Sequence, residues 1–263
     1  RDAKALQAGT SHFLGQNFAR AFNIQFQNQA GALEYAWTTS WGVSTRLIGA
    51  VIMTHSDDDG LVLPPRIAPV KTVILPIGTD EAALTGRILP KAEEIAGDLR
   101  RVLGGTAVTL DRQFHMRPAD RFFFHLQRGV PLRLELGQKD YAKGNVRFVR
   151  RDTGEKGDIP FEAVPRVVPE LLDRIQKDLH ANAKAFRLAN TVRVSSWDEF
   201  RSVIEERGGF VEAYFAGSVE DERHIKEETG ATPRCFPLSD DSRGRCFLTG
   251  RDGARLAVFA KAY

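Results

Sequence analysis

One largely apolar run, Val70–Ile77, most constrains the fold of this 263-residue chain. A run of this kind predicts a strand that is buried on both faces, as the strands of parallel sheets are. It follows the structure breakers Pro64-Pro65 and Pro69, which predict a domain boundary. Strand and helix patterns then alternate as far as about residue 190, so we expect an α/β domain.

The apolar residues of Asp80–Leu103 have helical spacing, and Pro90 predicts a kink or restart in that helix. Further strands are expected at Thr106–Leu110, Pro131–Leu136 and Val146–Arg151, and further helices at Arg121–Gln127 and from Phe161 to about Thr191. After residue 190 the pattern predicts a small α+β domain. Its expected helices are Asp198–Glu206 and Asp221–Thr229, and its expected strands are Phe210–Ala216, Leu256–Ala260 and short pieces at Phe236 and Cys246–Leu248.

The first 68 residues predict part of an antiparallel sheet with helices against it. Phe13–Phe22 is expected to be a helix, because Leu14, Phe18 and Phe22 recur every four residues. Ile24–Gln27 alternates as a half-buried strand does, and Tyr35–Trp37 is expected to return to the same sheet.

The stretch Thr38–His55 combines a strand with a helix. Its first half alternates aromatic and β-branched residues with small ones, and its second half has helical spacing that Ser44 or Thr45 can cap. Arg46 then lies in the first helical turn, where the helix dipole disfavours a cation, which suggests an anionic partner. The alternative is an arginine that reaches into solvent or pairs with Asp57 or Glu34.

Composition bounds the class of protein without naming a function. The chain is 42% hydrophobic and 27% charged with a net charge of +3, which is ordinary for a globular protein and does not require nucleic acid. The apolar run near Ile48–Met53 is too short to span a bilayer, and no signal peptide is visible. Two cysteines argue against a disulfide scaffold and fit a reducing cytosol. Because the first residue is arginine, we interpret the chain as a truncated or processed piece.

Three ordered segments resemble parts of one family. Ser40–Arg46, read Ser-Trp-Gly-Val-Ser-Thr-Arg and followed by an apolar helix, resembles the third signature motif of class II aminoacyl-tRNA synthetases. Gly9–Phe18 resembles the proline-pocket loop of prolyl-tRNA synthetases, and Gly60–Pro69 resembles the hinge before their anticodon-binding domain. The chain is thus similar, from end to end, to the C-terminal part of prolyl-tRNA synthetases of the archaeal and eukaryotic type.

The resemblance implies a fold in three parts. These are a remnant of the antiparallel-sheet catalytic domain at 1–68, an α/β anticodon-binding domain at 69–190, and a small α+β domain at 191–263. The implied activity is ATP-dependent activation of proline to prolyl-adenylate and transfer to tRNA(Pro), with Mg²⁺ bridging phosphates. The first two signature motifs are expected upstream, so the piece alone should be inactive. The family also implies a cytoplasmic homodimer without a membrane segment. The alternative is a non-catalytic tRNA-binding or regulatory relative.

The resemblance also implies site residues. His12, Ser40, Trp41 and Gly42 match the proline pocket, and Gln7, Thr10, Ser44 and Arg46 match the ATP contacts, with Arg46 as the catalytic arginine. A small secondary amino acid offers mainly its apolar ring as a handle, so a shape-matched slot suits it. The alternatives are a structural role for His12 and core packing for Trp41.

Basic residues gather between Arg133 and Lys156. The segments Gly129–Gly137 and Val149–Lys156 resemble the anticodon-binding domain, which favours contact of this strand face with tRNA. The expected tRNA-binding residues are Arg133, Glu135, Arg147, Arg150 and Arg151. The alternative is a solvated strand that nearby acidic residues neutralise. Ala119–Phe122 departs from the family's Gly-Trp-Lys-Phe-like run.

The last domain of the family often holds Zn²⁺ with four cysteines. Here only Cys235 and Cys246 are present, with Asp240 as a conceivable third ligand, so we expect a domain without zinc. The C-terminal Leu256–Tyr263 resembles the family's ending, whose terminal carboxylate returns to the catalytic domain. We therefore expect Tyr263 to be buried near the proline site.

Overall fold

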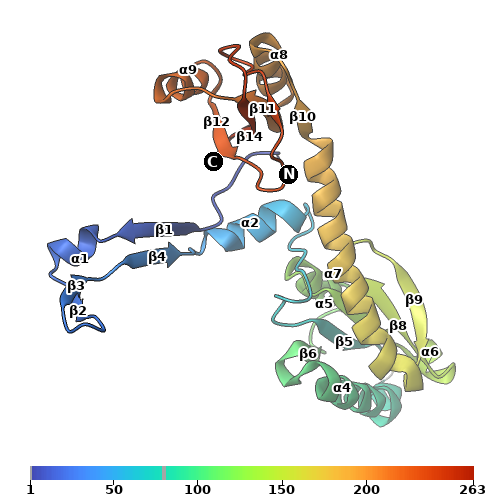
Figure 1. Ribbon diagram of the computed structural model, residues 1–263. Coiled ribbons are helices and arrows are strands. Elements are labelled where there is room, and N and C mark those ends of the chain that lie inside the picture. Colours follow the sequence, from blue (N-terminus) through green and yellow to red (C-terminus); the bar gives the residue numbers. More distant parts are fainter. Residues whose placement is uncertain (1, 79–80) are drawn as a thin grey trace. The chain divides into compact units, whose positions relative to one another are not determined.

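The structure is a computed structural model that describes residues 2–78 and 81–263 (Figure 1). The chain divides into two compact units. One is Val51–Leu188, and the other combines Arg1–Ala50 with Ala189–Tyr263. The mixed α/β and α+β architecture predicted from the sequence is confirmed.

The unit Val51–Leu188 is built on a mixed sheet in the order β6-β5-β7-β8-β9. The strand β5 pairs in parallel with β6 and β7, whereas β7–β8 and β8–β9 are antiparallel. The strands are β5 (Thr72–Pro76), β6 (Val108–Leu110), β7 (Leu132–Leu136), β8 (Asn145–Arg150) and β9 (Lys156–Pro160). The helices are α3 (Glu81–Ala83), α4 (Leu89–Leu103), α5 (Pro118–Gln127), α6 (Gln138–Ala142) and α7 (Val164–Ala189), with the short turns η1 (Leu84–Ile88), η2 (Gly105–Ala107) and η3 (Phe161–Ala163).

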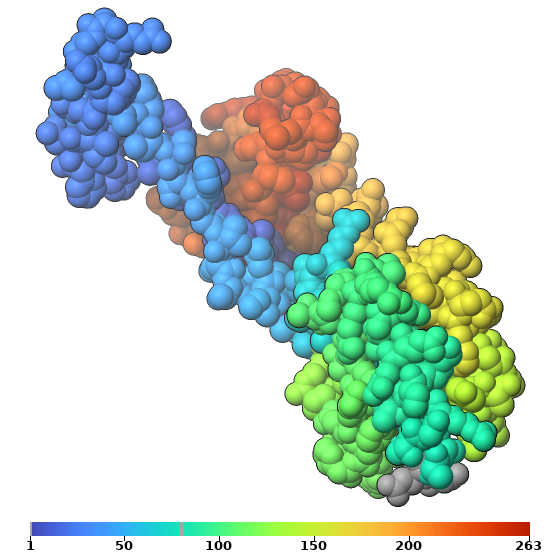
Figure 2. Space-filling view, turned by 90° about the horizontal axis from the view of Figure 1, so that it is seen from below, coloured from blue at the N-terminus to red at the C-terminus, as the bar shows by residue number. Residues whose placement is uncertain are grey.

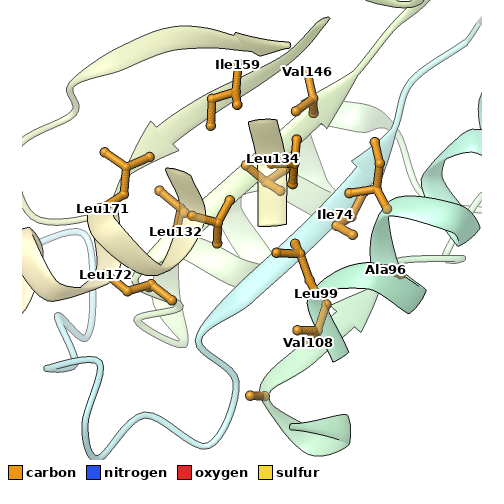
Figure 3. Close-up of a cluster of buried hydrophobic side chains, with 14 of the residues drawn as sticks. Ile74, Ala96, Leu99, Val108, Leu132, Leu134, Val146, Ile159, Leu171 and Leu172 are labelled. Atoms are coloured by element: carbon orange, nitrogen blue, oxygen red, sulfur yellow. The ribbon is translucent and has the colours of Figure 1, made fainter. Parts of the chain in front are cut away.

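The main core of this unit lies between the sheet and the helices α4 and α7 (Figure 3). Leu132 and Leu134 of β7 point at the same cluster as Leu99 of α4 and Leu171 of α7. All five residues of β5 are buried, as the apolar run predicts. Figure 2 shows the outer face of this unit, mostly from green to yellow, as one continuous surface.

The opposite face of the sheet holds a smaller apolar cluster and a buried ionic group. Val73 and Leu75 pack there with Val130. Asp111 accepts hydrogen bonds from Arg121 Nε at 2.9 Å and contacts His125 Nε2 at 2.6 Å, and all three residues are buried. Arg121 and His125 stand four residues apart on α5, so one helix face presents both to the carboxylate.

The restart predicted at Pro90 is confirmed, but a π turn before it and two further elements were not expected. The helix expected from Asp80, which lies outside the described residues, is interrupted by a π turn at Leu84–Ile88, and α4 restarts with Pro90 in its first turn. Proline fits there because the first helical N–H groups have no intrahelical acceptor. Two elements were not predicted: α6, which precedes β8, and the edge strand β9.

The segment after residue 190 folds around a second sheet, in the order β10-β11-β14-β12, with β13 also paired to β14. Its elements are β10 (Thr191–Arg193), α8 (Trp197–Ser202), η4 (Val203–Arg207), β11 (Phe210–Phe215), α9 (Val219–Thr229), β12 (Ala231–Cys235), β13 (Arg243–Gly244) and β14 (Ala254–Lys261). The core is aromatic: Phe200 lies 5.2 Å and Phe247 5.4 Å from Phe259, centroid to centroid. The strands expected at Phe236 and at Cys246–Leu248 are absent from the described residues. A strand ends at Cys235 instead, and a turn occupies 247–249.

The first 55 residues form two antiparallel pairs and two helices. The strand β1 (Thr10–Gly15) pairs with β4 (Thr38–Gly42), and β2 (Gln25–Gln27) pairs with β3 (Leu33–Tyr35). The helices are α1 (Asn17–Ala21) and α2 (Arg46–His55). The helix expected at Phe13–Phe22 is therefore wrong in its first turn, because pairing with β4 draws Phe13 into a strand. No helix among the described residues is long and apolar enough to cross a membrane.

Candidate functional site

An open hollow of about 260 Å³ lies where β1 and β4 meet the start of α2. It is lined by Gln7, Ala8, Gly9, Thr10, Gly42, Val43, Ser44 and Arg46. The register of the ladder explains the meeting, because Thr10 pairs with Gly42 and so sets the segments 7–10 and 42–46 side by side. Gly9 suits this place, since a Cβ there would lie 3.2 Å from the Gly42 carbonyl oxygen.

Polar groups of both segments converge on this hollow. Gln7 Nε2 donates to Thr10 Oγ1 at 2.9 Å, and Arg46 Nη1 donates to Gln7 Oε1 at 3.3 Å. The Arg46 amide lies 3.4 Å from Ser44 Oγ, as at a helix cap. All four residues that the resemblance assigns to ATP thus line one hollow.

Arg46 has an amide neighbour and, among the described residues, no acidic partner within 4 Å. The alternative partners considered from the sequence are engaged elsewhere. Asp57 pairs with Arg151, and Glu34 accepts from Asn28. An exposed guanidinium at a helix start with no carboxylate beside it is suited to an anionic ligand.

The four residues assigned to the proline pocket do not all share one face. His12 pairs with Ser40 across the ladder, and Ser11 pairs with Trp41. Because side chains alternate along strands, His12 and Ser40 lie on the face of Thr10 and Gly42, whereas Trp41 lies on the other. Trp41 is 79% exposed, so the alternative that it packs in a core is wrong for this chain.

The second candidate site is the basic strand face of the unit Val51–Leu188. Glu135 lies opposite Arg147 in the β7–β8 ladder and accepts from Arg133 Nε at 2.8 Å. The Arg133 guanidinium lies 4.7 Å from the Phe122 ring centre, and Arg147 contacts Asp158 at 3.3 Å. Arg133, Glu135 and Arg147 therefore stand together on one face.

Arg150 is placed differently from these three residues. Its side chain is 2% exposed and pairs with Asp152 and Asp178, each at 2.7 Å. The hydrogen bonds that Arg150 donates to Asp152 raise the pKa of this guanidinium further above its ordinary value. The expectation that Arg150 contacts RNA directly does not fit this burial, because a phosphate would have to displace those carboxylates.

Arg151 also has a structural partner. Its two Nη atoms donate to both oxygens of Asp57, at 2.6 and 2.8 Å, and its Nε donates to the Leu126 carbonyl. The hydrogen bond from Arg151 lowers the pKa of the Asp57 carboxyl group. This bidentate pair ties the turn after α2 to the end of β8.

Beside these residues lies a hollow of about 340 Å³. Its lining includes His125, Arg133, Arg151 and the turn Asp152–Gly154. Sequence reasoning missed His125 and Asp59, which also line it. The spacing of Arg121 and His125, four residues apart before a strand, was the only available signal for His125.

The candidate zinc ligands do not come together. Cys235 is exposed, and Cys246 is buried, where its sulfur accepts hydrogen bonds from the amides of Ala216 and Thr249 at 3.5 Å. Burial raises the pKa of the Cys246 thiol, but these hydrogen bonds outweigh it, and the pKa lies below its ordinary value. Within 2–78 and 81–263, no group of three or more His, Cys, Asp or Glu side chains is placed to hold a metal ion.

Tyr263 lies beside the segment that leads into the first hollow. Its amide donates to the Ala5 carbonyl at 3.3 Å, its hydroxyl bonds to Asp2, and Lys4 Nζ lies 5.2 Å from its ring centre. The hydrogen bond with Asp2 raises the pKa of the Tyr263 hydroxyl. The expectation that Tyr263 is buried is wrong for this chain, since it is 58% exposed.

Comparison with known families agrees with this geometry. Residues 71–171 match the family described as an anticodon binding domain, and residues 197–263 match the family described as prolyl-tRNA synthetase, C-terminal. The fold and its two hollows therefore define a chain of the aminoacyl-tRNA synthetase class.

Individual relatives narrow this class. The chain is 46% identical over its whole length to the proline–tRNA ligase of Bacteroides fragilis and 47% identical to that of Christiangramia forsetii. It also matches the solved structure of Giardia lamblia prolyl-tRNA synthetase in complex with prolyl-adenylate, with a TM-score of 0.90 and 30% identity, covering 99% of this chain and 57% of that one. The chain belongs to the prolyl-tRNA synthetase family, as the resemblance predicted, and it spans about half (53%) of the curated relatives it matches.

Proposed function

We propose that the chain is the C-terminal portion of a proline–tRNA ligase. The whole enzyme would use ATP to convert proline to prolyl-adenylate and would transfer the prolyl group to tRNA(Pro). The observation that carries this proposal is the convergence of Gln7, Thr10, Ser44 and Arg46 on one hollow. The Giardia lamblia relative, which aligns over 99% of this chain, was solved with prolyl-adenylate.

In this proposal Arg46 provides the positive charge for the nucleotide. A carboxylate oxygen of proline attacks the α-phosphorus of ATP, a new O–P bond forms, the bond from that phosphorus to the bridging oxygen breaks, and pyrophosphate leaves. Negative charge accumulates on the phosphate oxygens during this step, and a guanidinium without a competing carboxylate stabilises it. Gln7 would orient Arg46 through its 3.3 Å hydrogen bond.

His12 and Ser40 would form the polar part of the proline wall. They face each other in the ladder, on the face that carries Thr10. The Trp41 ring lies on the ladder face away from His12 and Ser40. Trp41 can therefore form part of the proline pocket only if a substrate or another protein segment lies on that face.

Magnesium does not fit the described residues by themselves. In the part of the chain that the structure describes, no carboxylate lines the hollow at Arg46, and Mg²⁺ prefers carboxylate, phosphate and water oxygens. We therefore assign it no ligand in this chain and no step.

The second part of the proposal is that the unit Val51–Leu188 binds the anticodon region of tRNA(Pro). Arg133 and Arg147 with Glu135 form the contact face, and Arg150 and Arg151 hold the strand that presents it. A cytoplasmic location and a homodimer belong to the same proposal, by analogy with the family.

Aminoacylation by the complete gene product tests the activity. We expect charging of tRNA(Pro) with proline and not with threonine, histidine or glycine. Arg46→Ala should lower the rate of proline-dependent pyrophosphate exchange about 100- to 1000-fold, the usual cost of removing one charge-stabilising donor. Arg20→Ala, an exposed arginine of α1, serves as the control and should change the rate less than twofold.

Two further results test the proposal, and the second separates it from its rival. The 263-residue chain alone should show no proline-dependent pyrophosphate exchange, because among the residues that the structure describes only one arginine lines the hollow. Absence of proline charging by the complete gene product, with retained tRNA(Pro) binding, would instead favour a non-catalytic tRNA-binding relative.

A further inference from the structure

Charge is separated along the segment after residue 190. Residues 191–230 carry five Lys and Arg against ten Asp and Glu, whereas residues 231–263 carry six against three. The acidic residues are concentrated on and around α8 and α9, and the basic ones on β12, β13, β14 and their connections. Residues 231–263 thus carry a net positive charge within a segment whose net charge is negative. We call their exposed arginines, Arg234, Arg243, Arg245, Arg251 and Arg255, the basic surface.

Two arginines of this basic surface stand directly opposite each other. In the β13–β14 ladder, Arg243 pairs with Arg255 and Gly244 pairs with Ala254. Like charges directly opposite on one face of an antiparallel pair destabilise the pair. A sequence that places two guanidinium groups there needs something to offset their repulsion.

No such group is present among the described residues. Neither Arg243 nor Arg255 has a carboxylate within 4 Å there, and both are exposed. The neighbouring arginines are engaged differently: Arg234 Nε donates to the Ala260 carbonyl, and Arg245 Nε donates to the Gly250 carbonyl. The opposed pair therefore has its donors free to bind an anion.

The backbone around this pair is firmly held. Tyr214 hydrogen-bonds Ser242 at 2.9 Å, and its ring packs so closely on Gly244 that a Cβ there would lie 2.4 Å away. Ser242 and Gly244 flank Arg243, so its Cα has little freedom. Arg255 in turn lies between two buried residues of β14, Ala254 and Leu256.

An aromatic ring completes the surface. The Arg255 guanidinium lies 5.1 Å from the centre of the Phe236 ring, which is partly exposed. A guanidinium on an aromatic face keeps its planar fork of donors free for a phosphate.

We propose that Arg243 and Arg255 form a phosphate-binding site for the backbone of RNA, separate from the anticodon-binding face. Arginine binds phosphate in a bidentate manner, and two adjacent guanidinium groups match successive phosphates of one strand. RNA is favoured over an acidic peptide because the surface joins guanidinium groups to an exposed aromatic ring. The identity of that RNA as tRNA rests on the proposed function.

Fluorescence anisotropy of a labelled tRNA(Pro) transcript with the 263-residue chain tests the proposal. The double variant Arg243→Ala/Arg255→Ala should weaken binding roughly tenfold near 100 mM salt. It should also reduce the slope of log Kd against log salt concentration by about 1 to 2, as expected for one or two lost phosphate contacts. The double Lys variant should keep most of that slope.

Arg223→Ala is the matched control, because it removes an exposed arginine from α9 on the acidic half. It should change the affinity less than twofold. Circular dichroism and urea unfolding establish that each variant is folded. The proposal is overturned if the double Ala variant binds tRNA as tightly as Arg223→Ala does. It is also overturned if polyglutamate displaces the labelled tRNA as effectively as unlabelled RNA of equal charge does.

A parallel variant, Arg133→Ala, separates this proposal from the proposed function. If Arg133→Ala binds tRNA more weakly and the Arg243→Ala/Arg255→Ala variant binds it as the unmodified chain does, the anticodon-binding function stands. Only the proposed site at Arg243 and Arg255 is then rejected. Failure of the unmodified chain to bind tRNA at any salt concentration contradicts both.

Discussion

The strands β4 and β5 have the same length and opposite environments. Every residue of β5 is buried, whereas β4 has one partly buried residue and is otherwise exposed. The strand β5 lies between β6 and β7 with apolar side chains packed on both faces, while within the described residues β4 has only β1 beside it. Local sequence thus makes a strand in both places, but burial needs neighbouring strands and a second layer.

The same difference governs the arginines of the two regions. Arg150 in the packed unit is enclosed by carboxylates and serves the fold. Arg46 beside β4 has one amide neighbour and stands open to a ligand. An arginine that the fold leaves without a carboxylate is therefore the better candidate for function.

Removing the enclosed arginine is the most severe test of this comparison. Arg150→Ala leaves the Asp152 carboxylate, which is 3% exposed, without its partner. We expect the free energy of unfolding of the Val51–Leu188 unit to fall by about 3–5 kcal/mol, the usual cost of breaking a buried pair. Urea unfolding followed by circular dichroism measures it.

Arg147→Ala is the control for this loss. Its pair with Asp158 is largely exposed, so its removal should cost about 0.5 kcal/mol or less. Equal losses for the two variants would show that burial does not distinguish these arginines.

Truncating one large side chain near each strand compares how much the surroundings of β4 and β5 contribute to stability. Leu134→Ala removes a fully buried side chain beside β5, and we expect a loss of about 2–5 kcal/mol from transfer and cavity terms. Trp41→Ala on β4 should change the free energy of unfolding by about 0.5 kcal/mol or less, because that ring is mostly in solvent. A loss at Trp41 as large as that at Leu134 contradicts the comparison.

The buried Asp111 makes the stability of the packed unit depend on pH. Burial raises the pKa of its carboxyl group, but hydrogen bonds from the Gln113 amide, His125 and Arg121 outweigh it, and the pKa lies below 3.8. A carboxyl group whose pKa is lower in the folded state contributes stability above its unfolded pKa of about 3.9 and loses it as pH falls through the folded pKa. Asp111→Asn should remove this acid-side loss and cost about 1–3 kcal/mol near pH 7.

Thermal unfolding at a series of pH values between 2 and 7 measures this effect. Asp158→Asn, which changes an exposed carboxylate of the same unit, provides the reference. A pH profile for Asp111→Asn that parallels that of the unmodified chain would falsify the assignment.

Helix caps should show the smallest effects. Ser218 Oγ accepts from the Asp221 amide at 3.2 Å at the start of α9, which packs on a core, so Ser218→Ala should cost about 1 kcal/mol. At the exposed start of α2, the Ser44 contact is 3.4 Å, and Ser44→Ala should cost about 0.5 kcal/mol or less. Thermal unfolding of both variants measures the difference, and a larger loss at Ser44 contradicts the expected order.

Strands and helices whose pattern depends on residues close together in the sequence were predicted correctly. The apolar run gave β5, and helical spacing after Ser44 gave α2 with Arg46 in its first turn. The edge strand β9 and the short helix α6 were missed, because Lys156–Pro160 and Gln138–Ala142 contain few apolar residues and no clear period.

The two sites differ in how far sequence alone could define them. The residues at the first hollow lie in two segments joined by one ladder, so a motif resemblance named them together. Strand alternation puts Arg150 on the other face from Arg147 and Arg151, yet the prediction named all three as tRNA-binding residues. Of the three, only Arg147 is exposed. Strand alternation could not reveal that Asp178, on a helix 28 residues later, encloses Arg150.

The sequence by itself determined the longer strands and helices, because short-range spacing encodes them, and its resemblance to known motifs indicated the family and the residues around Arg46. The tertiary structure alone decided which arginines are free, which face Trp41 occupies and which arginines stand opposite each other across β13 and β14. The physical reason is that exposure and charge pairing depend on segments distant along the chain, which only folding brings together.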